Sequence, residues 1–343
     1  MSEEISTASH LSVAMTTTGM TQITRGNAVI SSSPRGIEFY FQIAVLMIGV
    51  VGTAANALIL YALVAAKEHK TQVLIVHQNA LDLFTSFFMI VTYTIRLCNI
   101  HVSGSVGYWL CVVIHSECLV GWGTFASAIN LAAITVERYL RVVYSVWSKT
   151  KLRSWMIYSA MATAWIISFI YNIAVMFPTS DVIDGVCYAY AIWKNQAARM
   201  LYFIWNFLSF YVIVLFIFVF CYWRIVLVIR RQASVMANHA ASGSSAVQNQ
   251  LNQIQSNVTK TMILVSVCYA IAWLPHYIDF LIVSLHPHPI PFDGAFYAAV
   301  LWAYSYMCIN PFIYATKLDP VRQILLRLIP CKKTSEQVAG SAA

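Results

Sequence analysis

Residues 107–144 read GYWLCVVIHSECLVGWGTFASAINLAAITVERYLRVVY, and this stretch decides the fold. Up to Val136 its only Asp, Glu, Lys or Arg is Glu117. About 20 apolar residues are enough to cross a bilayer as a helix, so the stretch predicts a membrane span. Glu137 and Arg138 lie near its inner end, and we expect them to face neighbouring helices or the membrane boundary because contact with hydrocarbon is costly. An arginine that merely reaches the membrane edge would give the same local pattern.

The whole chain of 343 residues shares this apolar character. It is 59% hydrophobic and 10% charged, whereas soluble chains are about 25% charged. Seven long runs carry at most one charged residue each, which predicts an all-α membrane protein built as a seven-transmembrane helix bundle. The runs are 39–66, 71–95, 97–136, 154–180, 200–223, 261–278 and 294–316.

The positive charges predict the orientation of the bundle. With the N-terminus outside, 16 of the 21 lysines and arginines fall on the cytoplasmic side, as expected for a multi-pass protein of the plasma membrane. The net charge of +8 therefore reflects topology. No basic cluster on a soluble face points to a nucleic-acid partner. Acidic residues outnumber basic ones on the outer side, which weakly favours a basic ligand.

The regions outside the spans are polar. Residues 1–37 are predicted to be a disordered extracellular tail, residues 38–330 the transmembrane domain, and residues 331–343 a cytoplasmic tail. The Ser-, Ala-, Asn- and Gln-rich stretch at about 232–257 is predicted to be a flexible cytoplasmic loop. Cys331, next to two lysines at the membrane edge, suits palmitoylation, although an ordinary free thiol would fit equally well.

Asp82 lies near the middle of the second span. An ionisable group at that depth is expensive, and its default interpretation is functional, as an ion site or a proton-linked switch. A buried acid satisfied by hydroxyls and amides is the alternative. Both interpretations require partners, and the candidates are Asn56, Ser127 and Asn310.

The last two spans each contain an internal proline. Pro275 and Pro311 each remove a backbone hydrogen bond and predict kinks. Trp273 lies beside the first, and Asn310 and Tyr314 lie beside the second. Proline kinks in membrane helices are common, but two kinks that adjoin large or polar side chains favour a moving part.

The residues singled out above form an ordered set, one group to a span except the fifth. This set resembles the rhodopsin-like (class A) G-protein-coupled receptors over about residues 38–331. The segments WLPHYI and WAYS, with Ser145, look most like the galanin and allatostatin-type neuropeptide receptors. The matching motifs are Asn56, Asp82, Glu137-Arg138-Tyr139, Trp165, Trp273-Leu274-Pro275 and Asn310-Pro311-Phe312-Ile313-Tyr314.

The resemblance implies a switch that activates heterotrimeric G proteins by outward movement of the sixth helix. Arg138 would be held by Glu137 at rest and would turn toward Tyr222, Tyr314 and the G protein on activation. Arrestin would be a further partner, and residues 319–330 would form a short amphipathic eighth helix. The implied switch residues are Glu137, Arg138, Tyr139, Tyr222, Trp273, Pro275, Asn310, Pro311 and Tyr314.

The resemblance also implies an internal sodium site at Asp82, Ser127 and Asn310, as the only candidate cofactor. Tyr306 and Met307 stand where small polar residues are common in the family, which argues against sodium. A disulfide between Cys111 and Cys187 is implied as well. The third span, however, holds two residues more than the family's spacing, so Cys118 is a rival partner for Cys187.

The ligand-binding residues are predicted at the outer ends of the spans, with the loop around Cys187 as a lid. Aminergic relatives need a carboxylate at the position of Cys118 or Val120, and opsins need a lysine at Tyr304, so neither class fits. A peptide is expected, with a small non-amine molecule as the alternative ligand. The candidates are Glu117, Val120, Thr124, Asn206, His276, Asp279, Phe280, Phe296 and Tyr304.

A different class of function is a seven-helix transporter or ion pathway that uses Asp82 and Glu117 as relay groups. Such proteins carry internal repeats with broken helices in matching halves, and the sequence shows no such repeat. No metal-spaced histidine cluster, Ser/His/Asp set or phosphate loop is present in the sequence, so no enzyme activity is predicted.

Overall fold

The structure is a computed structural model that describes residues 35–68, 72–98, 103–190, 192–239, 246–285 and 294–328. Side chains at 35, 232–256 and 284 are not described. The predicted palmitoylation site at Cys331, the cytoplasmic tail and nearly all of the extracellular tail lie outside the described residues.

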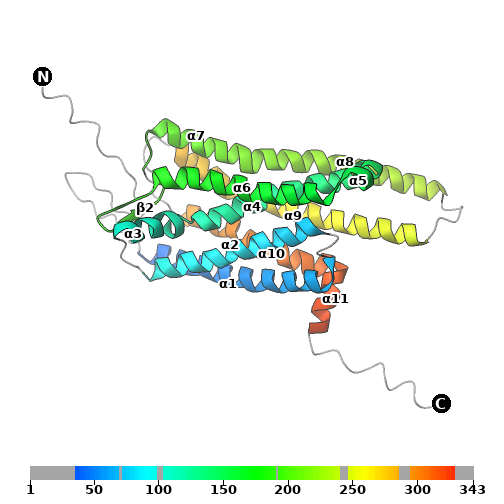
Figure 1. Ribbon diagram of the computed structural model, residues 1–343, viewed down its shortest axis with the longest axis horizontal. Helices are drawn as coiled ribbons and strands as arrows, with labels where there is room; N and C mark the ends of the chain where they lie inside the picture. The colour runs from blue at the N-terminus through cyan, green and yellow to red at the C-terminus, as the bar shows by residue number, and fades with distance from the viewer. Residues whose placement is uncertain are drawn as a thin grey trace, which may run out of the picture.

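Among the residues that the structure describes, seven helical segments are long and apolar enough to span a membrane, which confirms the seven predicted spans. They run side by side as one elongated bundle (Figure 1). Four spans are single helices, the sixth reaches into the cytoplasmic loop, and the third and fifth are built from several helical pieces. The spans are α1 (Arg35–Ala65), α2 (Val73–Leu97), α3 to α4 (Gly104–Val143), α6 (Ser154–Thr179), α7 to α8 (Gln196–His239), α9 (Ala246–Leu285) and α10 (Gly294–Lys317).

The third span shows where its two extra residues are placed. Helix α3 (Gly104–Leu110) passes into a π-helix, η2 (Cys111–His115), and α4 (Cys118–Val143) restarts after Glu117, whose φ is 60°. A π-turn holds more residues than an α-turn, and the left-handed Glu117 interrupts the helix before it continues. The insertion is therefore absorbed between Cys111 and Cys118.

The fifth span contains a similar local change. Helix α7 (Gln196–Phe207) passes through the π-helix η3 (Leu208–Val212) into α8 (Ile213–His239). The Tyr269 hydroxyl donates to the Phe210 carbonyl at 2.6 Å, and the Tyr211 hydroxyl donates to the Ala270 carbonyl at 2.8 Å. These two reciprocal bonds join the fifth and sixth spans at the level of the π-helix.

An outer hairpin carries the disulfide. Strands β1 (Asp181–Ile183) and β2 (Val186–Tyr188) pair antiparallel, and the turn residues Asp184 and Gly185 both have positive φ, as a tight two-residue hairpin turn requires. Cys187 on β2 is bonded to Cys111, with their Cα atoms 5.4 Å apart. Cys118 is a free, buried thiol. Of the two candidate partners of Cys187, Cys111 is therefore the one that forms the disulfide.

The opposite end of the bundle carries the short helices α5 (Ser145–Lys151) and α11 (Asp319–Leu328), and α11 turns away from the bundle axis (Figure 1). Val321 on α11 is buried, whereas Arg322 and Leu326 are exposed. The predicted amphipathic eighth helix is thus confirmed. The prediction of a flexible loop at about 232–257 is wrong for most of this stretch, because α8 continues to His239 and α9 begins at Ala246. Ala, Gln and Met in this stretch are good helix formers.

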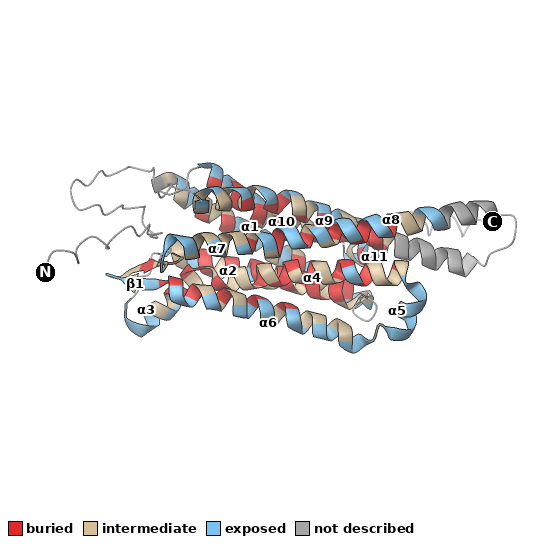
Figure 2. Cartoon of the chain, turned by 90° about the horizontal axis from the view of Figure 1, so that it is seen from above, coloured by how far each residue is buried: buried red, intermediate tan, exposed pale blue. Residues whose placement is uncertain are grey.

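Buried residues follow the inner faces of the helices, and exposed residues follow the outer ones (Figure 2). Phe216, Val219 and Trp223 on α8 are among the large apolar side chains exposed outward, as expected for a surface that meets lipid. The inner faces also hold polar side chains, and Asn56, Asp82 and Asn310 are completely buried. The bundle therefore has a polar interior that must be satisfied by its own hydrogen bonds.

Candidate ligand site and cytoplasmic switch

Glu117 is the centre of a polar cluster near the outer ends of three spans. Arg96 at the end of α2 approaches its carboxylate at 2.7 Å, from Nη1 to Oε1. The Tyr93 hydroxyl donates to Oε1 at 2.8 Å, and the Tyr304 hydroxyl on α10 donates to Oε2 at 2.5 Å. We call Tyr93, Arg96, Glu117 and Tyr304 the outer carboxylate cluster.

Arg96 neutralises this cluster. Its guanidinium also lies over the Tyr93 ring, 4.9 Å from the centroid, and donates to the His115 carbonyl on η2. The side chains of Arg96 and Glu117 are only 17% and 21% exposed. The charge of Glu117, one of the predicted ligand-site residues, is therefore already paired with a cation of the protein. A ligand must compete with Arg96 for this carboxylate.

Two further predicted ligand residues lie beside the outer carboxylate cluster. Val120 is buried in an apolar group with Val45 and Met89, and Tyr304 packs against that group. Thr124 follows one turn later on α4, and its hydroxyl has no hydrogen-bond partner within the described residues. The third span thus presents Glu117, Val120 and Thr124 along neighbouring turns, as predicted.

Four of the other five candidates lie on α7 and α9. His276 lies between Trp273, at 5.7 Å between ring centroids, and Phe280, at 4.9 Å. Phe203 on α7 meets Phe280 edge to face at 4.7 Å. Phe203, His276 and Phe280 thus form one aromatic group that joins α7 to α9. The remaining three candidates are on neighbouring elements: Asn206 (α7, buried), Asp279 (α9, partly buried) and Phe296 (α10, buried).

The segment after β2 covers the start of α4. Tyr190, with a φ of 55°, packs against Cys118 and Met176 and stacks on Tyr202 of α7 at 6.4 Å. Burial raises the pKa of the Tyr190 hydroxyl well above its usual value. The loop around Cys187 therefore closes over the third span in the manner expected of a lid.

The kink of α9 is tied to α10. Pro275 cannot donate to the carbonyl four residues earlier, which is that of Ile271. The indole N–H of Trp302 donates to this carbonyl at 3.2 Å. A side chain of the seventh span thus satisfies the backbone group that the proline leaves free. Trp273 is buried half a turn before the kink.

Asp82 lies among neutral donors at the middle of the bundle. Ser127 donates to Oδ1 at 3.0 Å, and Asn310 donates to Oδ2 at 2.8 Å, as predicted. The Gln78 amide, one turn earlier on α2, also donates to Oδ1 at 3.3 Å. Asn56 is not a partner of Asp82, because its amide donates to the Met307 carbonyl at 2.9 Å.

These residues do not fit a sodium ion. Hard cations in proteins are surrounded by oxygen ligands, whereas the Asp82 carboxylate is approached by the amide nitrogens of Gln78 and Asn310 and by the Ser127 hydroxyl. Tyr306 and Met307, both 1% exposed, stand where small polar residues would leave room. The three predicted residues meet, but hydrogen-bond donors of the protein already occupy both carboxylate oxygens of Asp82.

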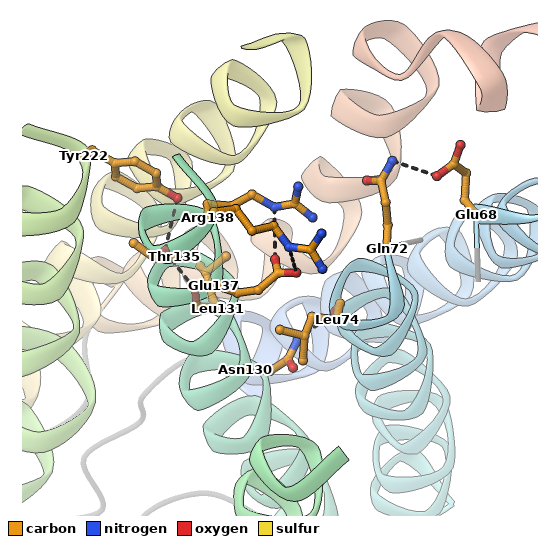
Figure 3. A network of polar contacts seen from close by, with 10 residues as sticks. Glu68, Gln72, Leu74, Asn130, Leu131, Thr135, Glu137, Arg138 and Tyr222 are labelled. Carbon is orange, nitrogen blue, oxygen red and sulfur yellow. Dashed lines mark hydrogen bonds and ion pairs between the residues drawn. The ribbon is translucent and has the colours of Figure 1, made fainter. Parts of the chain in front are cut away.

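The cytoplasmic end of α4 holds the predicted switch (Figure 3). Glu137 Oε2 lies 3.1 Å from Arg138 Nε, although this pair lacks the alignment of a good hydrogen bond. The other carboxylate oxygen accepts a shorter bond, 2.6 Å, from Arg141. Both Glu137 and Arg138 are 6% exposed. Glu137 thus lies between two arginines, Arg138 and Arg141, and shares its charge with both.

The hydrogen bonds of the switch tyrosines in this arrangement do not involve Arg138. The Tyr222 hydroxyl lies 3.1 Å from both the Thr135 and the Ser266 hydroxyls. Tyr314 is completely buried, and its hydroxyl has no hydrogen-bond partner within the described residues. Tyr139 packs edge to face with Tyr144 at 5.7 Å.

Sequence reasoning missed four residues that complete these sites: Gln78, Tyr93, Arg96 and Trp302. Two of them have a signal in the sequence, because Arg96 lies at the end of a span and Gln78 lies one turn from Asp82. Trp302 has no such signal, because its role depends on the three-dimensional position of the Ile271 carbonyl.

Comparison with known proteins agrees with this geometry. The family model for the 7 transmembrane receptor (rhodopsin family) matches residues 55–314. Galanin receptor type 1 of Rattus norvegicus is 24% identical over 326 residues, which cover 90% of this chain and 87% of that receptor. Galanin receptor 2b of Danio rerio is 25% identical over 297 residues, which cover 83% and 73%.

A solved structure shows the same fold. Squid rhodopsin superposes with a TM-score of 0.70 at 16% identity, and the match covers 92% of each chain. The family match spans most of this chain. The chain therefore belongs to the rhodopsin family of seven-transmembrane receptors, which are multi-pass proteins of the plasma membrane.

Proposed function

We propose that this receptor is activated by an extracellular peptide and signals to heterotrimeric G proteins through Arg138. The observation that carries the proposal is the buried Glu137–Arg138 pair at the cytoplasmic end of a rhodopsin-family bundle. A buried ion pair contributes little net stability because desolvation offsets its attraction. Its retention at this position is better explained by a switch than by stability.

Two observations support a peptide as the ligand. The galanin receptors named above match over most of the chain. The candidate region is also broad, because it extends from the outer carboxylate cluster to the aromatic group of Phe203, His276 and Phe280. Aromatic side chains with a few charged groups suit an extended ligand that has both apolar and polar side chains. A small non-amine molecule is the second candidate.

The proposed mechanism is a shift between two populated states. A ligand that binds better when His276 and Trp273 are displaced would favour movement of α9 about the kink at Pro275. Movement of its cytoplasmic end separates α9 from α10 and uncovers the inner end of α4. Arg138 would then exchange Glu137 for Tyr222, Tyr314 and the G protein.

A cavity of 320 Å³ lies on the cytoplasmic side between α9, α10 and α11, and Lys260, Leu264 and Lys317 contribute to its lining. We place the G protein, and arrestin as a further partner, at this face. No catalytic activity is proposed. The transporter alternative has only the carboxylates of Asp82, which is buried, and Glu117, which is partly exposed, in its favour, and protein donors occupy both.

The experiment is guanine-nucleotide exchange on a panel of G proteins, by membranes that contain the receptor, without ligand and with a library of short amidated peptides. We expect one peptide to stimulate exchange, and Arg138→Ala to abolish the stimulation while the peptide still binds. Arg153→Ala is the matched control, because Arg153 is an exposed cytoplasmic arginine. It should keep most of the activity.

Full exchange in Arg138→Ala would overturn the role of this residue. If no peptide or G protein gives exchange, but the protein conducts an ion or solute, the transporter interpretation replaces the receptor interpretation.

A further inference from the structure

Gln78 stands at the end of a buried chain of hydrogen bonds that leads to Asp82. It lies one helical turn before Asp82 on α2, so both side chains project from the same face. Its amide donates to Asp82 Oδ1 at 3.3 Å and to the Ser127 hydroxyl. Both Gln78 and Asp82 are completely buried.

The chain begins on α6, at Trp165. The indole N–H of Trp165 donates to His77 Nε2 at 2.8 Å, and His77 Nδ1 lies 2.9 Å from Asn130 Oδ1. Because Nε2 accepts, Nδ1 carries the proton in the neutral ring, and it donates to Asn130. The Asn130 amide then donates to Gln78 Oε1 at 2.9 Å.

Every donor in this chain therefore points toward the Asp82 carboxylate. Hydrogen bonds arranged in one direction polarise one another, which strengthens the last donor, the Gln78 amide. Asn310 supplies a further amide to the second carboxylate oxygen at 2.8 Å. The protein thus surrounds the anion with fixed donors from α2, α4 and α10, and the hydrogen-bond chain extends from the first of them to α6.

We propose that the Gln78 amide replaces a sodium ion at Asp82, so that the resting state of this receptor is stabilised without sodium. The amide is covalently attached and cannot exchange with the solution. Ligand affinity, ligand-independent G-protein activity and thermal stability are then independent of the sodium concentration. This inference rests on the fold and on the neighbours of Asp82, and it holds whatever the ligand of the receptor is.

The experiment measures the thermal unfolding midpoint of the purified receptor in sodium chloride and in N-methyl-D-glucamine chloride of equal ionic strength. The wild-type protein should give the same midpoint in both salts. Gln78→Leu removes the amide and leaves an apolar side chain of similar length, so the carboxylate becomes available to a cation. This variant should gain stability in sodium, by about 3 °C or more.

The double variant Gln78→Leu/Asp82→Asn should lose that gain, since its carboxylate is gone. A sodium-dependent midpoint in the wild-type protein that disappears in Asp82→Asn would overturn the proposal. A Gln78→Leu variant that folds but stays indifferent to sodium would overturn the assignment of Gln78. The wild-type comparison tests the proposal even if Gln78→Leu does not fold.

Discussion

Glu117 and Asp82 are two carboxylates inside the bundle that the protein satisfies in different ways. Glu117 is paired with a charged group, Arg96, at 2.7 Å, and both side chains keep about a fifth of their surface accessible. Asp82 is completely buried and accepts hydrogen bonds from hydroxyl and amide groups. Both are also joined to α10, through Tyr304 and Asn310 respectively.

The difference separates a partly accessible carboxylate from one that is closed to solvent. Under the function proposed above, a charged group of the ligand would compete for Glu117 or for Arg96. The donors of Asp82 are neutral, fixed on helices and closed to solvent. The first arrangement suits recognition, and the second suits the coupling of helices that must move together.

The largest effect is expected from Glu117→Ala. The change leaves the Arg96 guanidinium buried without a carboxylate, and breaking a buried pair in this way costs about 3–5 kcal/mol. We expect a strongly lowered thermal midpoint of the purified receptor. The double variant Arg96→Met/Glu117→Met should recover most of the loss, because neither charge remains. A single variant as stable as the wild type would show that the pair is not formed.

An intermediate effect is expected from Asn130→Leu, which interrupts the chain that ends at Asp82. His77 loses its acceptor and Gln78 loses a donor, and leaving buried polar groups unsatisfied should lower the free energy of unfolding by about 2–3 kcal/mol. The same thermal measurement checks it. Asn172→Leu is the control, because its amide bonds within α6 at a long 3.4 Å. Equal losses in both variants would argue against a connected chain.

The smallest effect is expected from Trp302→Phe. The ring remains, but the Ile271 carbonyl loses its donor, at a cost of about 1 kcal/mol. We expect faster amide hydrogen exchange around the kink of α9, with little change elsewhere. Trp155→Phe, at an exposed indole, is the control and should leave exchange at the kink unchanged. An unaltered pattern in Trp302→Phe would mean that this bond does not restrain the kink.

The spans, the eighth helix and the meeting of Asp82, Ser127 and Asn310 could be predicted from the sequence. Span prediction works because a helix that crosses lipid must be continuous and apolar. Asp82 can be recognised from the sequence as a residue with partners, because a charge at that depth needs them. The family motifs then indicate which residues those partners are.

The partners of Glu117 could not be predicted in the same way. They depend on how far the outer third span is rotated, and that rotation is set by the π-helix at Cys111–His115 and the left-handed Glu117. Neither has a compositional signal. The sequence therefore showed that two residues were extra but left Cys111 and Cys118 as rival partners of Cys187. For the same reason the sequence indicated only that Arg96 lies on the outer side, and it gave no sign that Arg96 pairs with Glu117.

The position of Pro275 along α9 has a mechanical consequence. The helix continues 10 residues beyond the proline on the outer side and 29 residues on the cytoplasmic side, which at 1.5 Å per residue gives arms of about 15 Å and about 44 Å. A rotation of the helix about Pro275 therefore displaces its cytoplasmic end roughly three times as far as its outer end. A shift of about 1 Å at the outer end, the size of one side-chain rearrangement, becomes about 3 Å at the cytoplasmic tip.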